Sequence, residues 1–488
     1  MRSEAWIGSE KIDHGEDKPR EECGVYGIYA PGQQVASLTY LGLQVLQHRG
    51  QEGAGIAVSS GDYIMAVKDV GLVHQALRGG ESLKGLPDGH IATGHVRYGT
   101  HIGNSLDDSF RAVQPMIGKS EKTGIEFTVS HNGHILNFDE LSQKLPHNGG
   151  YATDSELITR LIANELDRDS CPDLPTAITA AVSRLKGAYS LVVMSKDSLL
   201  GIRDPHGFRP LVLGELPGSG WVIASETGAL DITKAEFKRE VEPGEIVEIN
   251  DTGLNSFHPF ERVDPALCAF EFVYFSRPDA VMEGENVART RIRMGKQLAV
   301  ECPVEADIVI GAPYSGSLAA KGFSDESGIE LVEEGLVKNR YVGRSFIVAG
   351  QLNRENAVRM KLNANRSFIE GKRTVLIDDS IVRGTTTTEI VKMLRNAGAS
   401  EVHLRISSAP YRWPCFYGMD TGDPSKLIAV QHEAINQICQ ELGADSLEYL
   451  STEGLRLAIG PLAGHKICLA CMTGKYPTEV PRDSGVLK

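Results

Sequence analysis

The stretch VLIDDSIVRGTTTTE, residues 375–389, constrains the possible fold more than any other part of this chain. Its first three residues are apolar, which predicts a strand buried on both faces, as in a parallel sheet. Asp378 and Asp379 follow at the carboxyl end of that strand, where ligands bind in open α/β sheets. Gly384 permits a close backbone approach, and the threonines after it begin a helix whose free N–H groups can bind phosphate. We interpret the stretch as a site for a sugar phosphate carrying Mg²⁺, rather than as two solvated acids beside a threonine-capped helix.

The pattern of apolar residues divides the chain into two halves. From residue 24 to about 262, short β-like runs dominate and only two helical patterns interrupt them. Many strands with few helices predict stacked sheets flanked by helices. Further along, a helix precedes a strand between 286 and 313, and strand, helix and strand alternate between 374 and 408. This alternation predicts a parallel α/β sheet, which is followed from about residue 424 by a helical, cysteine-bearing tail.

Composition excludes several classes of protein. The 488 residues carry a formal net charge of −14, which argues against a nucleic-acid partner. No apolar run approaches the roughly 18 residues needed to cross a bilayer, so no membrane partner is expected, and the polar N-terminal tail is not a secretory signal. Eight cysteines are too few for a disulfide scaffold in a chain of this length. We therefore expect a reducing, cytoplasmic setting, with metal or catalytic roles for some of the cysteines.

Cys23 stands between a polar tail, residues 1–22, and a strand-like run that starts at Gly24. Four small polar clusters follow, each at the end of a β-like run: LQHRGQEGAG (46–55), GHVRYGT (94–100), SHNGHI (130–135) and ATDSE (152–156). Together with Cys23 they resemble the class II glutamine amidotransferases, a branch of the N-terminal-nucleophile hydrolases. In that family a propeptide is cleaved immediately before the cysteine, so the resemblance implies that residues 1–22 are removed.

The chemistry of a terminal cysteine explains why such a tail would have to be removed. A free α-amine has a pKa of about 7.7–8.0, so it can accept the proton of its own residue's thiol near neutral pH. While Glu22 is attached, the Cys23 nitrogen is an amide and cannot act as a base. The resemblance implies that Arg97 binds the α-carboxylate of glutamine and Asp154 its α-ammonium group. It also implies an oxyanion hole made by Asn132 and the Gly133 N–H.

Each of these residues also has a plainer interpretation by itself. A lone cysteine is usually a small buried apolar residue, an arginine is usually part of a surface ion pair, and Asn-Gly is usually a turn. The occurrence of all four clusters in the family's order favours the site.

The stretch at 375–389 resembles the signature of the type I phosphoribosyltransferases, which bind 5-phosphoribosyl-1-pyrophosphate (PRPP). The resemblance implies that the two acids contact the ribose hydroxyls and that the following loop binds the 5′-phosphate. The residues assigned to PRPP in this way are Asp378, Asp379, Ser380, Arg383, Gly384, Thr385, Thr386 and Thr387. A second loop, GAPYSGS at 311–317, matches the family's pyrophosphate loop in position. The residues assigned to Mg²⁺ are Ser315, Asp378 and Asp379.

One residue departs from this family pattern. Tyr314 occupies the position in the pyrophosphate loop where an acid is expected. A tyrosine has a pKa of about 10 and offers no charge at neutral pH, so it could only stack or donate its hydroxyl there.

A single family joins the two halves in this order, the glutamine PRPP amidotransferases, and the resemblance runs from about Cys23 to about Glu479. It implies a propeptide at 1–22, a class II glutamine amidotransferase domain at 23–262 with a four-layer αββα sandwich, and a phosphoribosyltransferase α/β domain at 263–488 with a parallel sheet. The implied activity is glutamine hydrolysis and transfer of the ammonia to PRPP, giving 5-phosphoribosylamine, glutamate and pyrophosphate in the first committed step of purine synthesis. Purine nucleotide inhibitors and a homotetramer are also implied. We expect the basic segment 337–362 to close over PRPP.

Four cysteines match those that hold a 4Fe-4S cluster in one branch of this family: Cys268, Cys415, Cys468 and Cys471. The last two form a C-x-x-C pair, which places two sulfurs on one small loop. Spacing alone leaves open a structural Zn²⁺ site or reduced core cysteines, and only the resemblance favours iron–sulfur. Three other cysteines match nothing in the family: Cys171, Cys302 and Cys439.

Three other functions compete with this hypothesis. A structural or scaffolding protein would have no reason to keep Cys23 or Asn132. An amidotransferase acting on another phosphorylated acceptor would share the first half of the chain but would lack the stretch at 375–389. A nucleotide-sensing paralogue without activity would keep that stretch but tend to lose Cys23 or Asn132, and both residues are present.

Overall fold

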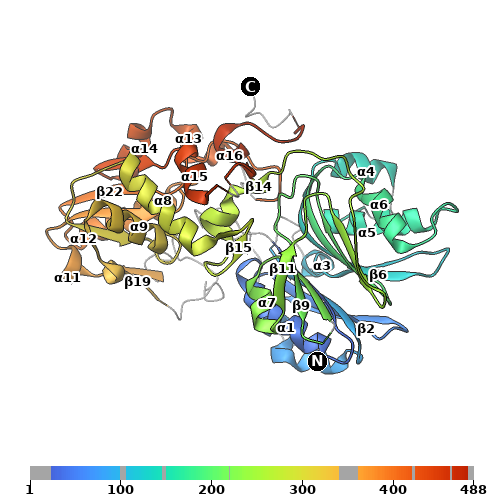
Figure 1. Ribbon diagram of the computed structural model, residues 1–488. Helices are drawn as coiled ribbons and strands as arrows, with labels where there is room; N and C mark the ends of the chain where they lie inside the picture. The colour runs from blue at the N-terminus through green and yellow to red at the C-terminus, as the bar shows by residue number, and fades with distance from the viewer. Residues whose placement is uncertain are drawn as a thin grey trace.

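The computed structural model describes residues 23–98, 106–145, 150–218, 220–339, 361–419, 424–461 and 464–481. The expected propeptide and most of the expected PRPP-closing segment lie outside the described residues. Two lobes lie side by side, the first coloured blue to green and the second yellow to red in Figure 1. The last strand of the first lobe ends at Phe257 and the first strand of the second begins at Leu267, and the boundary at 262 stays a prediction.

Two antiparallel sheets form the centre of the first lobe. The seven strands of one sheet are, in spatial order, β11 (Glu236–Glu240), β9 (Val212–Leu216), β10 (Gly220–Ala224), β1 (Gly24–Tyr29), β4 (Ile91–Arg97), β2 (Gly53–Ser59) and β3 (Ile64–Val70). The six strands of the other are β13 (Gly253–Phe257), β12 (Ile246–Asn250), β8 (Leu199–Arg203), β7 (Gly187–Met194), β6 (Glu126–Ile135) and β5 (Met116–Lys119).

Strand β1 shows why this lobe has four layers. Val25 packs in the core between the two sheets, together with Val192 and Ile223. Tyr26 and Ile28 face the opposite side of the sheet, in a core that the covering helices complete. The helices on this side are α1 (Val35–Val45), α2 (Val73–Ala76) and α7 (Gly228–Thr233). Helices α4 (Phe138–Lys144), α5 (Asp154–Leu166) and α6 (Leu174–Val182) cover the six-stranded sheet, so the predicted αββα sandwich is confirmed.

The second lobe is built on the predicted parallel sheet. Its strands are, in spatial order, β18 (Glu330–Leu331), β17 (Ile308–Gly311), β21 (Arg373–Asp378), β22 (Glu401–Ile406) and β23 (Ser446–Tyr449). Helices α8 (Val287–Glu301), α9 (Ser317–Ser327) and α15 (Thr452–Ile459) pack on one face. Helices α11 (Arg366–Ile369), α12 (Thr385–Asn396) and α14 (Ile435–Leu442) pack on the other. Strand β23 lies within the tail that we expected to be helical, so that part of the prediction was incomplete.

Strand β21 is apolar on both sides because both sides are covered by helices. Val375 and Ile377 point into the core that contains α8 and α9, and Leu376 points into the core that contains α12. Burial on both faces of the parallel sheet therefore explains why residues 375–377 are all apolar.

Short elements complete the two lobes. The two-stranded pairs are β14 (Leu267–Cys268) with β24 (Ile467–Cys468), β15 (Val281–Met282) with β16 (Glu285–Asn286), and β19 (Leu336–Lys338) with β20 (Leu362–Ala364). The short helices are α3 (Leu106–Arg111), α13 (Ile428–Gln431) and α16 (Ala470–Thr473). Within the described part of the chain, no helix has the length and apolar character needed to span a membrane.

Candidate functional site

A pocket in the first lobe brings together the five residues predicted for glutamine. The antiparallel register of β1 and β4 pairs Gly24 with Val96, which places Cys23 beside Arg97. The residues that line the pocket are Cys23, Arg97, Tyr98, Ala112, Gln114, His131, Asn132, Gly133, His134, Thr153, Asp154, Ser155 and Gly418. They come from strands of both sheets, from the first turn of α5 and, at Gly418, from the second lobe.

The thiol of Cys23 lies in the wall of the pocket and is partly buried. Its Sγ is 3.9 Å from the Tyr98 carbonyl oxygen. Burial raises the pKa of the thiol to about 11, although the Tyr98 contact and the nearby guanidinium of Arg97 act in the opposite direction. At neutral pH the thiol is therefore protonated, and a nucleophilic role requires a base next to it.

The oxyanion side of the pocket is shaped by strand β6. Asn132 is fully buried, and neither its side-chain oxygen nor its nitrogen has a hydrogen-bond partner among the described residues. A buried amide without partners is costly unless a ligand supplies them. Gly133 has a φ of +146°, and a Cβ there would lie 2.1 Å from the Ala188 carbonyl oxygen. Only glycine fits this position, which keeps the Gly133 backbone close to the pocket.

Asp154 is held in its ionised form by two histidines that the sequence analysis did not assign. Burial by itself would raise the pKa of this carboxyl group, but His131 and His134, each with Nδ1 at 3.6 Å, outweigh it and hold the pKa below its usual range. His131 is fixed in turn by Ser155, whose hydroxyl lies 3.1 Å from Nδ1, and by Gln114, which accepts its backbone N–H at 2.7 Å. Both histidines flank the Asn-Gly pair in the motif SHNGHI, and this adjacency was the available signal.

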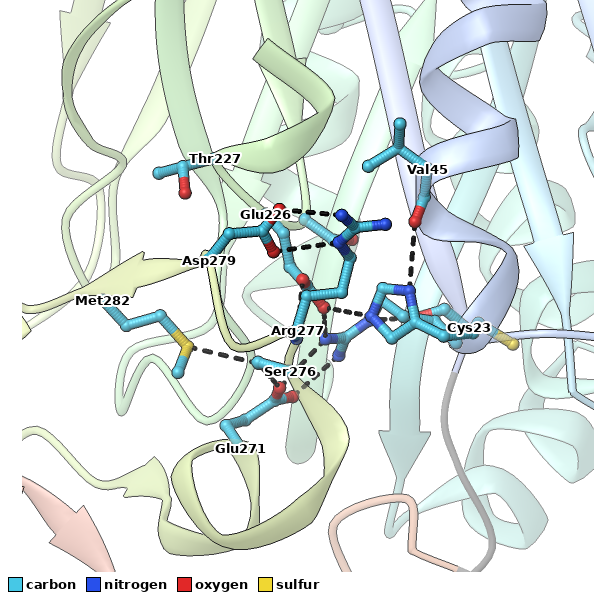
Figure 2. Close-up of polar contacts among 12 residues, drawn as sticks. Cys23, Val45, Glu226, Thr227, Glu271, Ser276, Arg277, Asp279 and Met282 are labelled. Atoms are coloured by element: carbon cyan, nitrogen blue, oxygen red, sulfur yellow. Dashed lines mark hydrogen bonds and ion pairs between the residues drawn. The ribbon is translucent and has the colours of Figure 1, made fainter. Parts of the chain in front are cut away.

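A buried ion network joins the nucleophile to the second lobe (Figure 2). The Arg49 guanidinium donates to Glu226 at 2.6 Å, to Glu271 at 2.7 and 2.9 Å, and to the Cys23 carbonyl oxygen at 3.2 Å. Ser276 donates its hydroxyl to Glu271 at 2.6 Å. Burial would raise the pKa of both carboxyl groups, but their basic neighbours outweigh it: the pKa of Glu226 lies at about 2, and that of Glu271 lies below its usual range. The network is therefore ionised at neutral pH.

The predicted PRPP residues lie at the carboxyl ends of two neighbouring strands. Asp378 ends β21, and the loop with Ser315 follows β17, which pairs with β21 in parallel. The Ser315 hydroxyl lies 3.5 Å from an Asp378 carboxylate oxygen. The Ser380 hydroxyl donates to Asp379 at 2.6 Å, and both acids are buried. Carboxylate and hydroxyl oxygens are suitable ligands for Mg²⁺, so the donors present fit the predicted ion.

The predicted phosphate loop leads directly into helix α12. Gly384 has a φ of +81°, and a Cβ there would lie 2.5 Å from Ile428 Cδ1, so this position requires glycine. Helix α12 begins at Thr385, which places the backbone N–H groups of the predicted phosphate residues at a helix N-terminus. Tyr314 is 60% exposed, and the Lys338 ammonium lies 5.0 Å above its ring.

The four expected cluster cysteines gather where the two lobes meet. Cys268 and Cys468 are direct partners in the β14–β24 pair. Burial, together with the neighbouring cysteines, raises the pKa of both thiols to about 12. Cys471 and Cys415 lie near enough to take part in this mutual effect. All eight cysteines are free thiols, and in the described part of the chain no group of three or more His, Cys, Asp or Glu side chains has the geometry of a metal site.

Four cysteines are the number of thiolates that either a 4Fe-4S cluster or a Cys₄ zinc site takes, so the donor set fits both groups. The cysteines here lie among apolar residues such as Phe270, Tyr411 and Met472.

Fold and site together define a class of protein, a glutamine amidotransferase joined to a lobe with a parallel sheet. The family model described as a glutamine amidotransferase domain matches residues 101–231. Amidophosphoribosyltransferase from Synechocystis sp. is 47% identical over 474 residues, 96% of this chain and 93% of its own length. The Bacillus subtilis amidophosphoribosyltransferase is 45% identical over 95% of this chain and 96% of its own length. The chain belongs to the amidophosphoribosyltransferase family.

Solved structures agree with this assignment over nearly the whole chain. The structure of the allosteric regulatory enzyme of purine biosynthesis matches with a TM-score of 0.87 and 44% identity, covering 95% of this chain and 98% of that one. The glutamine PRPP amidotransferase from B. subtilis, complexed with ADP and GMP, matches with a TM-score of 0.86 and 44% identity over 95% and 99%. The two-lobe architecture is therefore shared with enzymes of this family.

Proposed function

We propose that the chain hydrolyses glutamine in the first lobe and transfers the ammonia to PRPP in the second, giving 5-phosphoribosylamine, glutamate and pyrophosphate. The observation that carries this proposal is the pocket that unites Cys23 with the unpartnered amide of Asn132. Family membership supports it, since the relatives named above are amidophosphoribosyltransferases. None of the competing functions has a specific observation in its favour.

In the proposed glutamine reaction, Cys23 acts after removal of residues 1–22. Its free α-amine accepts the thiol proton, and Sγ attacks the side-chain amide carbon of glutamine. Asn132 and the Gly133 N–H would stabilise the resulting oxyanion. The protonated amine then gives its proton to the leaving ammonia, and water hydrolyses the thioester to glutamate. Arg97 and Asp154 would hold the α-carboxylate and the α-ammonium group of the substrate.

In the proposed second reaction, ammonia attacks C1 of PRPP and pyrophosphate leaves. Asp378 and Asp379 would hold the ribose hydroxyls, and Gly384 and the threonines from Thr385 to Thr388 would hold the 5′-phosphate. Ser380 and Arg383 would complete the PRPP site. Mg²⁺ held near Ser315 and Asp378 would neutralise charge on the departing pyrophosphate. The short distance between Ser315 and Asp378 supports this arrangement.

The remaining cofactor and partner assignments belong to the same proposal. Cys268, Cys415, Cys468 and Cys471 would hold a 4Fe-4S cluster, which supplies a structural link between the segments that carry these cysteines. We propose that purine nucleotides inhibit the enzyme, and the structural relative with bound ADP and GMP supports this. We also propose a homotetramer and a cytoplasmic location, the latter supported by the eight free cysteines.

Two measurements test the function. Pyrophosphate release from PRPP should depend on added glutamine, and added ammonia should replace glutamine. Cys23→Ala should abolish the glutamine-dependent reaction and leave the ammonia-dependent one, because PRPP and ammonia do not need the thiol. A chain that releases pyrophosphate with neither nitrogen source contradicts the proposal.

Cofactor identity is tested by composition. Protein purified without oxygen should contain iron and sulfide in equal amounts and absorb visible light. A colourless, active protein with stoichiometric zinc would replace the iron–sulfur assignment.

A further inference from the structure

One wall of the glutamine pocket comes from the other lobe. Gly418 lines the pocket that contains Cys23 and Asn132, whereas the other described residues that line it lie between positions 23 and 155. Its φ of +114° is one that other residues rarely adopt. The pocket is therefore complete only when the segment around Gly418 is seated against the first lobe.

The residue before this wall, Tyr417, is fixed to the first lobe through its ring and its backbone. It is 2% exposed, and its ring stacks on Phe208 with centroids 4.0 Å apart and an angle of 16° between the planes. Its carbonyl oxygen accepts a hydrogen bond from the buried Arg209 guanidinium. Its hydroxyl lies 2.9 Å from the Thr478 hydroxyl. These contacts leave little freedom for Gly418, which follows directly in the chain.

Phe208 connects Tyr417 to the strand opposite the oxyanion side of the pocket. Both rings belong to a small apolar cluster that includes Ala188, the residue whose carbonyl oxygen excludes a Cβ at Gly133. The buried Asp204 carboxylate accepts the N–H groups of Phe208 and of Tyr189, both at 3.2 Å. Movement of the Phe208 ring would therefore be transmitted to the backbone that borders the oxyanion side.

We propose that Tyr417 is a positioning residue for glutamine hydrolysis, which holds Gly418 as a pocket wall and supports the backbone opposite Gly133 through Phe208. This inference rests on the proposed glutamine reaction. The backbone N–H of Tyr417 also donates to Cys415 Sγ at 3.3 Å, so the loop that carries Tyr417 also carries one of the cysteines expected to bind the cluster. The loop therefore connects the glutamine pocket directly to the region of the four cysteines. The proposed PRPP residues at the end of β21 take no part in the contacts described here.

The test removes the stacking ring and follows each half of the reaction separately. We expect Tyr417→Leu to raise the KM for glutamine and to slow alkylation of Cys23 by a γ-diazoketone analogue of glutamine, each by about tenfold to a hundredfold, the range for a small misplacement of reacting groups. Ammonia-dependent synthesis and its KM for PRPP should stay within about twofold, since the second site does not use this pocket. Phe208→Leu removes the other ring of the stack and should give the same pattern.

Tyr411→Leu is the matched control. Tyr411 is 1% exposed and makes its ring contact with Phe270, within the second lobe. Tyr411→Leu also removes a buried ring, but the ratio of glutamine-dependent to ammonia-dependent activity should stay at the wild-type value.

Unchanged alkylation and glutamine KM in Tyr417→Leu would overturn the inference. Equal loss of both reactions in Tyr417→Leu and Phe208→Leu would also overturn it, because that is the signature of a general structural role. The wild-type protein separates this result from a failure of the proposed function: if it hydrolyses no glutamine at all, the function itself is wrong.

Discussion

Replacing Arg49 by methionine tests the buried ion network between the lobes. The guanidinium is 1% exposed, and methionine would keep its approximate length while removing its charge and donors. Glu271 would lose bonds of 2.7 and 2.9 Å and keep the Ser276 hydroxyl at 2.6 Å and the Arg209 guanidinium at 3.6 Å. Glu226 would lose a bond of 2.6 Å and keep His48 at 2.8 Å and the Arg277 N–H at 3.1 Å.

The expected cost follows from these remaining contacts. Removing one partner of a buried ion pair costs about 3–5 kcal/mol, because an uncompensated charge stays in the interior. Both carboxylates keep at least one hydrogen-bond partner, so we expect a loss at the lower end of this range, about 3 kcal/mol of the free energy of unfolding. Urea denaturation followed by tryptophan fluorescence measures this, since Trp221 lies in β10 of the first lobe and Trp413 in the second.

The deficit should also depend on pH, with a sign that the carboxyl groups determine. Arg49 helps to hold the pKa of Glu226 at about 2 and that of Glu271 below its usual range. A carboxyl group whose pKa is lowered by folding contributes stability above its unfolded pKa of about 4.3, and the contribution is lost as pH falls through the folded pKa. Without Arg49 these pKa values rise, so protonation relieves the variant at lower pH. The deficit should therefore be smaller at about pH 5.5 than at about pH 7.5.

The exposed pair of Lys84 and Glu81 provides a control. Their side chains are 75% and 68% exposed, and Lys84→Met should cost less than about 1 kcal/mol. A deficit for Arg49→Met as small as that of the control, or one that does not change with pH, would refute the reasoning. Adding Glu271→Gln to Arg49→Met should restore part of the stability at neutral pH, because the uncompensated charge is then removed.

Three further predictions concern the two proposed reaction sites. Asp378→Asn and Asp379→Asn should each weaken PRPP binding and slow ammonia-dependent synthesis by about tenfold or more while sparing basal glutamine hydrolysis; wild-type PRPP affinity in both variants would reject their assignment. In protein whose intact mass still includes residues 1–22, Cys23 should react slowly with iodoacetamide at neutral pH, and the rate should rise about tenfold per pH unit below the thiol pKa of about 11. Protein without the tail should react faster at the same pH, and equal rates for the two forms would argue against the α-amine as the base. Tyr314→Asp should leave the KM for PRPP similar or higher, and a large improvement would reopen the possibility of a different phosphorylated acceptor.

The strand and the helix that carry the proposed PRPP residues could be predicted because their signals are local. The apolar run 375–377, the two acids and the threonines lie within one strand, one turn and the first turn of a helix, and the structure places them there. The requirement for glycine at 384 has a similar local origin in its positive φ. Ser315 was assigned through resemblance, but its closeness to Asp378 follows from the pairing of β17 with β21.

The glutamine half depended on resemblance, because its residues come from clusters far apart in the chain. Nothing in the runs 94–100 or 130–135 alone indicates that Arg97 and Asn132 share a pocket, since strand register and sheet stacking decide it. Periodicity did predict the sheets, and β1 illustrates its limit. Val25 and Ile28 are both apolar, yet one faces the other sheet and the other faces a helix layer.

Contacts between the lobes were outside the reach of sequence reasoning. Arg49 and Glu271 are 222 residues apart and look like any other charged residues until the fold buries both. Gly418 is one of 52 glycines, and its place against the glutamine pocket depends on its neighbour Tyr417, which stacks on Phe208 and accepts a hydrogen bond from Arg209. Both contacts bring a residue of the second lobe near Cys23. Glu271 binds Arg49, which donates to the Cys23 carbonyl oxygen, and Gly418 forms part of the wall of the pocket that contains Cys23. An enzyme that must deliver ammonia from one lobe to the other gains from such contacts, because a glutamine site completed by the second lobe is formed only when that lobe is in place.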